Sequence, residues 1–304
     1  MAEYVLQTTM LTKIFGKQKA VNQVSMNVEK GSVYGFIGKN GAGKTTFMKM
    51  ICGLSAQNSG EIILFGKKAG ELKDIRHRVG CLIEAPGIFP KLSAYENVRL
   101  KCLAMGCYEP GYVNGLLEKV GLGDTGKKQA GRFSLGMRQR LGIAMALVGD
   151  PELLVLDEPI NGLDPQGIAE VRDTIHSLSE DNGITILISS HILDELSKIA
   201  THYGIINDGI LLREMSASEM LEARTDGIQI KVNNYKKASE ILGNMGFEFT
   251  SPEAFVLSVK ADGERAAEIN RALVTGGVDV SELTVHSEDL ESYYLKMTGG
   301  AGNV

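Results

Sequence analysis

The feature that most constrains the fold is a glycine-rich segment between an apolar run and a segment with helical spacing. Residues 38–45 read Gly-Lys-Asn-Gly-Ala-Gly-Lys-Thr, which matches the pattern GxxxxGK[ST]. Val33–Ile37 before it has the length of a strand, and Lys44–Ile51 after it has helical periodicity. Glycines let the backbone curl so that successive N–H groups point inward, and the helix adds its positive N-terminal end. The unit therefore predicts a site for a phosphate group.

Within this unit the residue types predict distinct roles. Lys44 would reach the β- and γ-phosphates of a nucleotide, and the Thr45 hydroxyl would ligate Mg²⁺. The alternative is a glycine-rich turn without function, which the strand before it and the helix after it disfavour. The candidate nucleotide-binding residues of this segment are Gly38, Lys39, Asn40, Gly41, Ala42, Gly43, Lys44, Thr45 and Thr46.

A second signal is an apolar run that ends in two acids, Leu153–Leu156 followed by Asp157 and Glu158. Such a strand delivers its carboxylates to the edge of a buried sheet, where ligands bind in α/β proteins. Asp157 suits Mg²⁺, directly or through water, and Glu158 could accept a proton from an attacking water. Taken alone, the pattern is more often a strand that enters a solvated loop. The phosphate loop upstream favours the catalytic interpretation.

Composition narrows the class of protein. The 304 residues, 43% of them hydrophobic and 23% charged, can form one large domain or a full domain plus a small one. The net charge of −5 gives no overall positive field, so no nucleic-acid partner is expected. Four cysteines without a CxxC pair predict reduced thiols in a cytosol. No apolar run reaches the roughly 20 residues of a membrane span, and no signal peptide is recognisable, which predicts a cytoplasmic protein.

Strand and helix signals alternate through the first two thirds of the chain. Short strands are expected at Tyr4–Leu6 and Val24–Val28, with later strands at Leu153–Leu156 and Ile184–Ile188 around a helix at Pro165–Ser179. Alternating strands and helices predict a parallel α/β core with helices on both faces. An inserted, mainly helical subdomain is expected at about 87–149, with helices at Ala94–Met105, Gly111–Val120 and Ser134–Val148.

The pattern changes near residue 219. Downstream, strands and helices follow in the order βαββαβ, which resembles a small ferredoxin-like α+β unit, and a last helix is expected at Ser287–Met297. His286, Glu288 and Asp289 cluster at the start of that helix, where capping by Ser287 is the simplest account.

With these motifs in place, residues of about 3–218 resemble the nucleotide-binding subunit of an ATP-binding cassette (ABC) transporter. Residues 133–140, Phe-Ser-Leu-Gly-Met-Arg-Gln-Arg, stand where the family signature LSGGQ belongs. Asn161-Gly162-Leu163-Asp164 matches the D-loop, His191 matches the switch histidine, and Phe15 stands where an aromatic ring stacks on adenine. The resemblance implies an α/β P-loop NTPase core of the ABC type, with an antiparallel β subdomain and the inserted helical subdomain. It implies a nucleotide-binding domain at 1–218 and an accessory domain at 219–304.

The resemblance also implies roles for single residues. Ser134 and Gly136 would bind the γ-phosphate of ATP held by another subunit, and Asp164 would lie at the same nucleotide. His191 would keep the attacking water in place, so that Glu158, His191 and Lys44 form the catalytic set, and Thr45, Glu84 and Asp157 the Mg²⁺ set. Taken alone, Ser134 is more often a helix N-cap, His191 a turn residue and Phe15 an edge-strand core residue.

The chain departs from the family pattern at two places. Glu84 stands where the Q-loop glutamine is usual, which keeps a hard oxygen ligand but adds a negative charge beside the phosphates. The signature has Leu135 and Met137 in place of a glycine and a glutamine. Glu84, followed by Ala-Pro-Gly-Ile-Phe-Pro, is similar to the bacitracin-resistance and lantibiotic-immunity branch of ABC exporters. Lys91–Asn97 is either a contact with a membrane subunit or an exposed helix start capped by Ser93.

The expected function is that of the ATPase subunit of a multi-subunit exporter, peripheral on the cytoplasmic face of the cell membrane, with ATP and Mg²⁺ as cofactors. The expected partners are an integral membrane permease and a second nucleotide-binding subunit, in a homodimer or a heterodimer. The alternative is a soluble ABC ATPase that acts on ribosomes or DNA, although such proteins usually carry two cassettes or a long coiled-coil insertion. A purely regulatory module would lack the catalytic carboxylate, whereas Glu158 is present.

Overall fold

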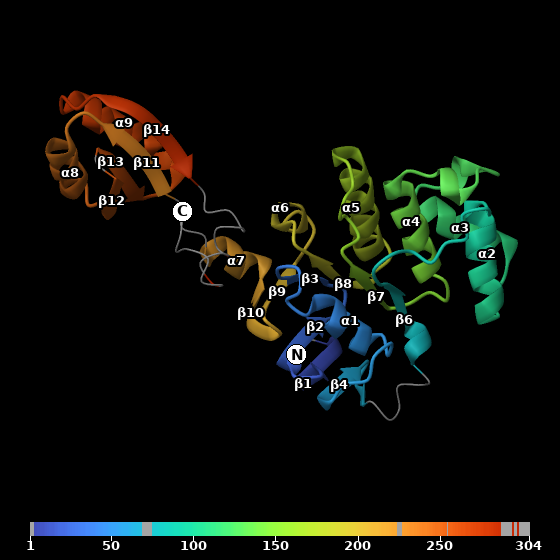
Figure 1. The fold of residues 1–304 in the computed structure, drawn as a ribbon. Helices are drawn as coiled ribbons and strands as arrows, with labels where there is room; N and C mark the ends of the chain where they lie inside the picture. Colours follow the sequence, from blue (N-terminus) through green and yellow to red (C-terminus); the bar gives the residue numbers. More distant parts are fainter. Residues whose placement is uncertain are drawn as a thin grey trace. The chain divides into compact units, whose positions relative to one another are not determined.

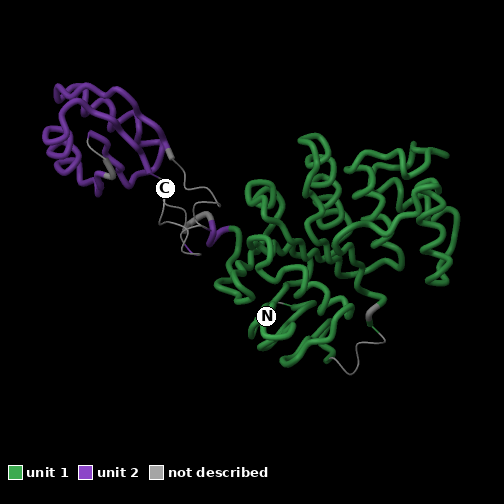
Figure 2. Tube along the Cα trace, in the orientation of Figure 1, with its two compact units in different colours: residues 1–217 green, residues 218–304 purple. Residues whose placement is uncertain are grey.

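The structure, a computed structural model, describes residues 3–68, 75–223, 227–253 and 255–286, together with Tyr294 and Met297. The chain forms two compact units, residues 1–217 and 218–304 (Figure 2). The helix expected at Ser287–Met297 lies outside the described residues, except for Tyr294 and Met297. Ser287, Glu288 and Asp289 are among the residues that are not described.

The first unit is built from two sheets and their covering helices (Figure 1). Its strands are β1 (Tyr4–Phe15), β2 (Gln18–Glu29), β3 (Val33–Ile37), β4 (Ser59–Leu64), β5 (Lys67–Lys68), β6 (Val79–Leu82), β7 (Leu153–Asp157), β8 (Thr185–Ser190), β9 (His202–Asn207) and β10 (Ile210–Ser216). Its helices are α1 (Lys44–Ile51), α2 (Ala94–Met105), α3 (Pro110–Lys119), α4 (Leu135–Ala146), α5 (Pro165–Glu180) and α6 (Leu193–Leu196). A further helix, α7 (Ala217–Ala223), begins at the last residue of this unit.

The central sheet has the strand order β10-β9-β3-β8-β7-β6. Its strands from β9 to β6 run parallel, and every residue of β3, β7 and β8 is buried, as expected for a sheet covered on both faces. The sheet is mixed rather than wholly parallel, because β10 pairs antiparallel with β9. Asp208 and Gly209, with φ of 47° and 77°, form the two-residue turn between them, and such turns close tight hairpins.

The second sheet is antiparallel, with the order β2-β1-β4-β5. The expectation of short strands was wrong here, since β1 and β2 each span 12 residues. Their pairing shifts register between Thr8 and Leu11, and Met10 and Gln23 adopt positive φ. These irregularities interrupt the two-residue alternation by which a strand is recognised in a sequence. Leu6, Met26 and Phe47 belong to one buried cluster that joins this sheet to α1 and the central sheet.

Three helices, α2, α3 and α4, gather next to the β6 end of the central sheet (Figure 1). Each lies within two residues of its predicted bounds, and α2 has the predicted ones. Ser93 caps α2 in a capping box with Glu96, so the Ser93 cap is confirmed. Among the residues that the structure describes, no helix has both the length and the apolar character needed to cross a bilayer.

In the second unit, residues 227–253 and 255–286 follow the order strand, helix, strand, strand, helix, strand. These elements are β11 (Gly227–Val232), α8 (Tyr235–Asn244), β12 (Phe249–Glu253), β13 (Val256–Lys260), α9 (Ala266–Thr275) and β14 (Val280–His286). The strands form an antiparallel sheet in the order β12-β13-β11-β14. Side chains from alternate positions of β11 and β13 pack with those of α8 and α9 into a separate apolar core, including Ile228, Ile230, Leu242, Leu257 and Leu273.

Candidate nucleotide-binding and hydrolysis site

The loop between β3 and α1 has a backbone that only glycine tolerates at one position. Gly43 has a φ of 109°, and a Cβ atom there would lie 2.3 Å from the carbonyl oxygen of Ala20. Gly41 also has a positive φ, of 84°, but faces open space. Gly43 therefore lets the loop pass close to β2 and deliver the chain into α1, whose first residue is Lys44.

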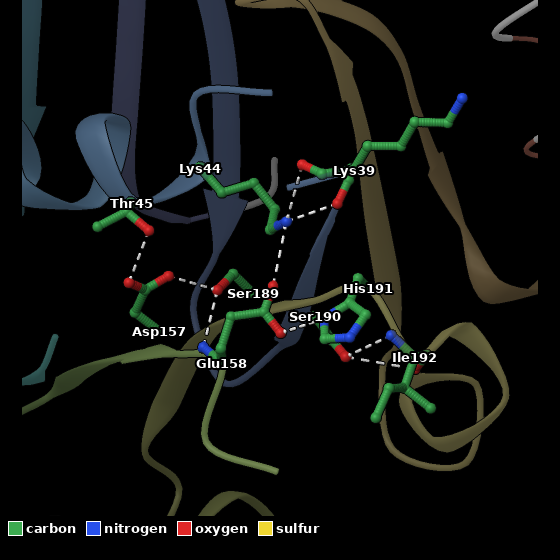
Figure 3. Close-up of polar contacts among 10 residues, drawn as sticks. Lys39, Lys44, Thr45, Asp157, Glu158, Ser189, Ser190, His191 and Ile192 are labelled. Atoms are coloured by element: carbon green, nitrogen blue, oxygen red, sulfur yellow. Dashed lines mark hydrogen bonds and ion pairs between the residues drawn. The ribbon is translucent and has the colours of Figure 1, made fainter. Parts of the chain in front are cut away.

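The loop curls around the side chain of its own lysine. Lys44 is only 5% exposed, and its Nζ donates to the carbonyl oxygens of Gly38 and, at 3.3 Å, of Lys39. The same Nζ lies 3.1 Å from Oε1 of Glu158 (Figure 3). The ammonium group is thus held between the loop and the end of β7, with an acid as its counter-charge.

A hydrogen-bonded chain of three side chains joins α1, β7 and β8. The Thr45 Oγ1 donates to Oδ2 of Asp157 at 2.8 Å, and the Ser189 Oγ donates to Oδ1 of Asp157 at 2.7 Å (Figure 3). Asp157 and Ser189 are 3% and 0% exposed and stand opposite each other in the parallel pairing of β7 with β8. Two of the three predicted oxygen ligands, Thr45 and Asp157, are therefore in direct contact. Ser189 was not predicted.

Glu158 lies between two basic side chains. Its Oε2 is 2.7 Å from Nδ1 of His191, and its Oε1 faces the Lys44 ammonium (Figure 3). The Glu158 backbone has a φ of 49°, and its N–H donates to the Ser189 Oγ at 2.9 Å. The Ser189 hydroxyl thus binds both acidic residues: it donates to the carboxylate of Asp157 and accepts from the backbone N–H of Glu158. The arrangement can bind a polyphosphate at the loop and keep a carboxylate ready to take a proton.

The signature and D-loop residues form a second group at two helix starts. Ser134 is the N-cap of α4, with its Oγ accepting from the N–H of Met137 at 3.2 Å, and Asp164 caps α5 in the same way through Gly167. A Cβ on Gly136 would lie 3.3 Å from Cα of Gly167, so the two helix starts are in close contact. Among the described residues, no polar contact joins Lys44 and its neighbours to Ser134, Gly136 or Asp164.

Two further candidates lie at the margin of the site. Phe15 is 55% exposed at the end of β1, with the Lys13 Nζ 5.0 Å from its ring centroid, so its interpretation as a core residue was wrong. Glu84 has a φ of 63° and forms an ion pair of 2.5 Å with Lys49 of α1. The added negative charge of Glu84 therefore has a cationic partner on the helix that also carries Thr45. Lys49 was not predicted.

Comparison with known proteins gives a consistent result. Residues 21–161 match the ABC transporter family. The chain is 40% identical over 300 residues to the bacitracin transport ATP-binding protein BcrA of Bacillus licheniformis, covering 97% of this chain and 98% of that protein. It is 46% identical over 220 residues to the lantibiotic transport ATP-binding protein SrtF of Streptococcus pyogenes, covering 72% of this chain and 94% of that protein.

A solved structure gives the same fold. The cbiO1 protein of Clostridium perfringens, described as part of the ABC transporter complex cbiONQ, aligns with a TM-score of 0.66 and 26% identity. The alignment covers 73% of this chain and 92% of cbiO1. Together with the loop, the acid pair and the full-length relatives, this shows that the chain belongs to the ATP-binding proteins of ABC transporters and is an ATPase of that family.

Proposed function

We propose that this ATPase powers a transporter that exports a peptide antibiotic of the bacitracin or lantibiotic type. The observation that carries the proposal is the similarity over nearly the whole chain to a protein named for bacitracin transport. The relative named for lantibiotic transport supports the same substrate class through the first unit. Glu84 in place of the family glutamine is the sequence feature by which this branch was predicted.

Mg²⁺ fits the residues at the end of β7. Thr45 and Asp157 offer a hydroxyl and a carboxylate oxygen within 2.8 Å of each other, and hard oxygens are the ligands that Mg²⁺ prefers. We propose that these two residues hold the ion, and that Glu84, which pairs with Lys49 of α1, is its third ligand. When bound, the ion supplies positive charge to the phosphate oxygens.

ATP binding would exchange the partner of Lys44. In the structure, the Lys44 ammonium is paired with Glu158 and with loop carbonyls. A triphosphate in the loop offers a stronger anionic partner, which would draw the ammonium away from Glu158. Glu158 then keeps its contact with His191 and is available to accept the proton of an attacking water. His191 would hold that water and the carboxylate in place.

A second copy of the chain, or a related subunit, would complete each site. A serine hydroxyl has one donor and two acceptor positions, so Ser134 can cap α4 and still donate to a phosphate. We propose that Ser134, Gly136 and Asp164 serve the nucleotide of the partner subunit, and that Phe15 stacks on the adenine. A self-complementary pair closes two such sites.

We also propose how the chain is divided and where it works. Residues 1–218 form the nucleotide-binding domain, with a helical subdomain at about 87–149, and residues 219–304 form an accessory domain. The strand order β12-β13-β11-β14 supports a ferredoxin-like type for the latter. A permease would contact the segment after Glu84 and Lys91–Asn97, and would hold the protein at the cytoplasmic face of the membrane.

The test is the Glu158→Gln variant. It should bind ATP with wild-type affinity in calorimetry, whereas its hydrolysis should fall by about 10²- to 10⁴-fold because the proton acceptor is gone. Glu152→Gln is the matched control, since Glu152 precedes β7 and pairs with Arg78 at the surface. Wild-type hydrolysis by Glu158→Gln would show that the base lies elsewhere.

The substrate is tested in cells. Expressed with its permease in a bacitracin-sensitive host, the wild-type chain should raise the tolerated bacitracin or lantibiotic concentration, and Glu158→Gln should not. Co-purification with ribosomes or DNA, in place of a polytopic membrane protein, would refute the transport proposal.

A further inference from the structure

A hollow of the surface lies beside α2 and α3, away from the residues of the nucleotide site. Its volume is about 720 Å³, which is in the range of sites that hold small molecules. Its walls are the start of α2 with the residues before it, one side of α3, and residues 123–129, which precede α4 (Figure 1). None of the residues that line it belongs to the phosphate loop, the acid pair or the signature.

Three cations line this hollow against a single acid. Lys91 precedes α2, Arg99 lies on α2, and Lys127 lies between α3 and α4. All three side chains are exposed, and none of them forms an ion pair with a residue that the structure describes. With Glu96 as the acid, three positive charges against one negative leave +2 in the hollow, although the whole chain carries −5. Cations gathered around a hollow raise the local concentration of anions.

The acid of the hollow is already bound within the start of its own helix. The Glu96 Oε2 accepts from the backbone N–H and from the hydroxyl of Ser93, both at 2.8 Å. The backbone hydrogen bond first, and the hydroxyl next, hold the pKa of Glu96 below its usual range. Glu96 is thus committed to the capping box rather than to an ion pair with a lysine of the hollow.

Aromatic side chains position Arg99. Its guanidinium carbon lies 5.2 Å from the ring centroid of Tyr108, and the Tyr108 hydroxyl is 3.2 Å from that of Tyr95, which also lines the hollow. The ring contact leaves the five N–H donors of Arg99 without an oxygen acceptor among the described residues. A planar fork of free donors matches the oxygens of a phosphate group.

We propose that this hollow is a second anion site, separate from the nucleotide site, that binds a phosphate monoester. Such a group carries a charge close to −2 at neutral pH, which matches the charge of the hollow, whereas a carboxylate carries only −1. The same group is found on small soluble phosphate esters and on the headgroup of phosphatidic acid. Lys91, Arg99 and Lys127 approach it from three walls of the hollow.

The hollow adjoins the segment that leads to the signature. Two backbone hydrogen bonds of 2.8 Å join residues 130–131 to residues 90–92. A phosphate held by both Lys91 and Lys127 would add a bridge between the same two segments and would steady the approach to Ser134. The consequence for Ser134 rests on its proposed function, whereas the anion site does not.

The first experiment locates the site on the full-length chain. Lysines are acetylated in the presence and absence of glycerol 3-phosphate, and the rate at each lysine is read by mass spectrometry. Acetylation of Lys91 and Lys127 should slow severalfold, whereas Lys128, whose ammonium group lies 5.6 Å from the ring centroid of Phe133, should react as before. Unchanged rates at Lys91 and Lys127, or equal protection by lactate at the same ionic strength, would overturn the proposal.

The second experiment tests Arg99 through the same readout. Arg99→Ala should require on the order of tenfold more glycerol 3-phosphate to protect Lys127, because a hydrogen-bonded charge is lost. Arg99→Lys, which keeps the charge but not the fork, should fall between Arg99→Ala and wild type, and Lys128→Ala should match wild type. Equal protection in Arg99→Ala and wild type would refute the role of Arg99.

The third experiment distinguishes the two sources of the phosphate. Lys91 belongs to the segment proposed to contact the permease, so a lipid headgroup would be within reach if that proposal holds. Vesicles of phosphatidic acid in phosphatidylcholine should then sediment with wild type and with Lys128→Ala, but much less with the Lys91→Ala/Lys127→Ala double variant. Protection by glycerol 3-phosphate without this difference in sedimentation would assign the site to a soluble ester.

Amide exchange tests the link to the signature. At full occupancy, the amides of residues 130–131 should exchange severalfold more slowly in wild type but not in the double variant. Unchanged exchange would overturn that link. None of these measurements requires ATP or a permease, so failure of both phosphate probes would refute the anion site and leave the proposed function standing.

Discussion

Ser189 is the residue whose replacement tests the site geometry most directly. It is fully buried, and its hydroxyl donates to Asp157 at 2.7 Å while it accepts from the N–H of Glu158 at 2.9 Å. The Ser189→Ala variant removes both bonds and leaves a buried carboxylate oxygen and a backbone N–H without this partner. We expect it to lower both the stability of the first unit and its rate of ATP hydrolysis.

The magnitude follows from the two bonds. A buried hydrogen bond to a charged group contributes about 1.5–3 kcal/mol and a neutral one about 1 kcal/mol, which together give about 3 kcal/mol. For a unit of this size each kcal/mol shifts Tm by about 2–4 °C, so the expected loss is about 6–12 °C. The rate of ATP hydrolysis should fall as well, because Glu158 loses the hydrogen bond that fixes its backbone conformation.

The assay is calorimetric unfolding of the nucleotide-free chain, with the transition of the first unit identified by its shift on addition of Mg·ATP. Ser190→Ala is the matched control, since Ser190 is equally buried but its hydroxyl bonds to the backbone of Ile192 instead, accepting from the N–H at 2.9 Å and donating to the carbonyl oxygen at 3.3 Å. That control loses one short and one long neutral hydrogen bond, so it should lose about 1–1.5 kcal/mol, or about 2–6 °C. Equal Tm and equal turnover in Ser189→Ala and Ser190→Ala would refute the reasoning.

Three further substitutions test other parts of the chain. Gly43→Ala should abolish ATP binding in calorimetry because its Cβ would meet a backbone carbonyl oxygen, whereas Gly41→Ala, which is strained by its φ of 84° but has its Cβ in open space, should weaken binding less. Glu84→Gln should leave stability within about 0.5 kcal/mol, since the ion pair with Lys49 is exposed, but should change the Mg²⁺ dependence of hydrolysis; unchanged hydrolysis and transport would remove a role for Glu84. Burial and a neighbouring carboxylate raise the pKa of Tyr34, so the neutral phenol stabilises the fold below about pH 10, and this contribution is lost as pH rises further. Urea midpoints at pH 8 and pH 11 should therefore differ more in wild type than in Tyr34→Phe.

Local signals predicted the elements around the nucleotide site well. The bounds of β3, α1 and α2 agree with those expected, because each element is marked by a signal within a few residues of it: an apolar run, a glycine loop and the Ser93 cap. The long β1 and β2 were not predicted, because their shifts of register break the alternating pattern. The antiparallel edge strand β10 was also missed, since its place in the sheet depends on pairing with β9.

The site residues that belong to sequence motifs were predicted, and those outside any motif were not. Lys44, Thr45, Asp157, Glu158 and His191 come from separate segments, and the structure brings them into one hydrogen-bonded and ion-paired group. The two residues that were missed, a serine in β8 and a lysine in α1, belong to no motif. Their importance comes from neighbours that only the folded chain provides.

The parallel pairing of β7 with β8 makes the contact between Asp157 and Ser189 a property of the sheet. An extra residue between α5 and β8 would lengthen a surface connection and leave Asp157 and Ser189 opposite each other. An extra residue inside β8 would instead bring Ile188 beneath the buried carboxylate. A one-residue shortening would place Ser190 there, so the tandem hydroxyls let this strand tolerate contraction better than expansion.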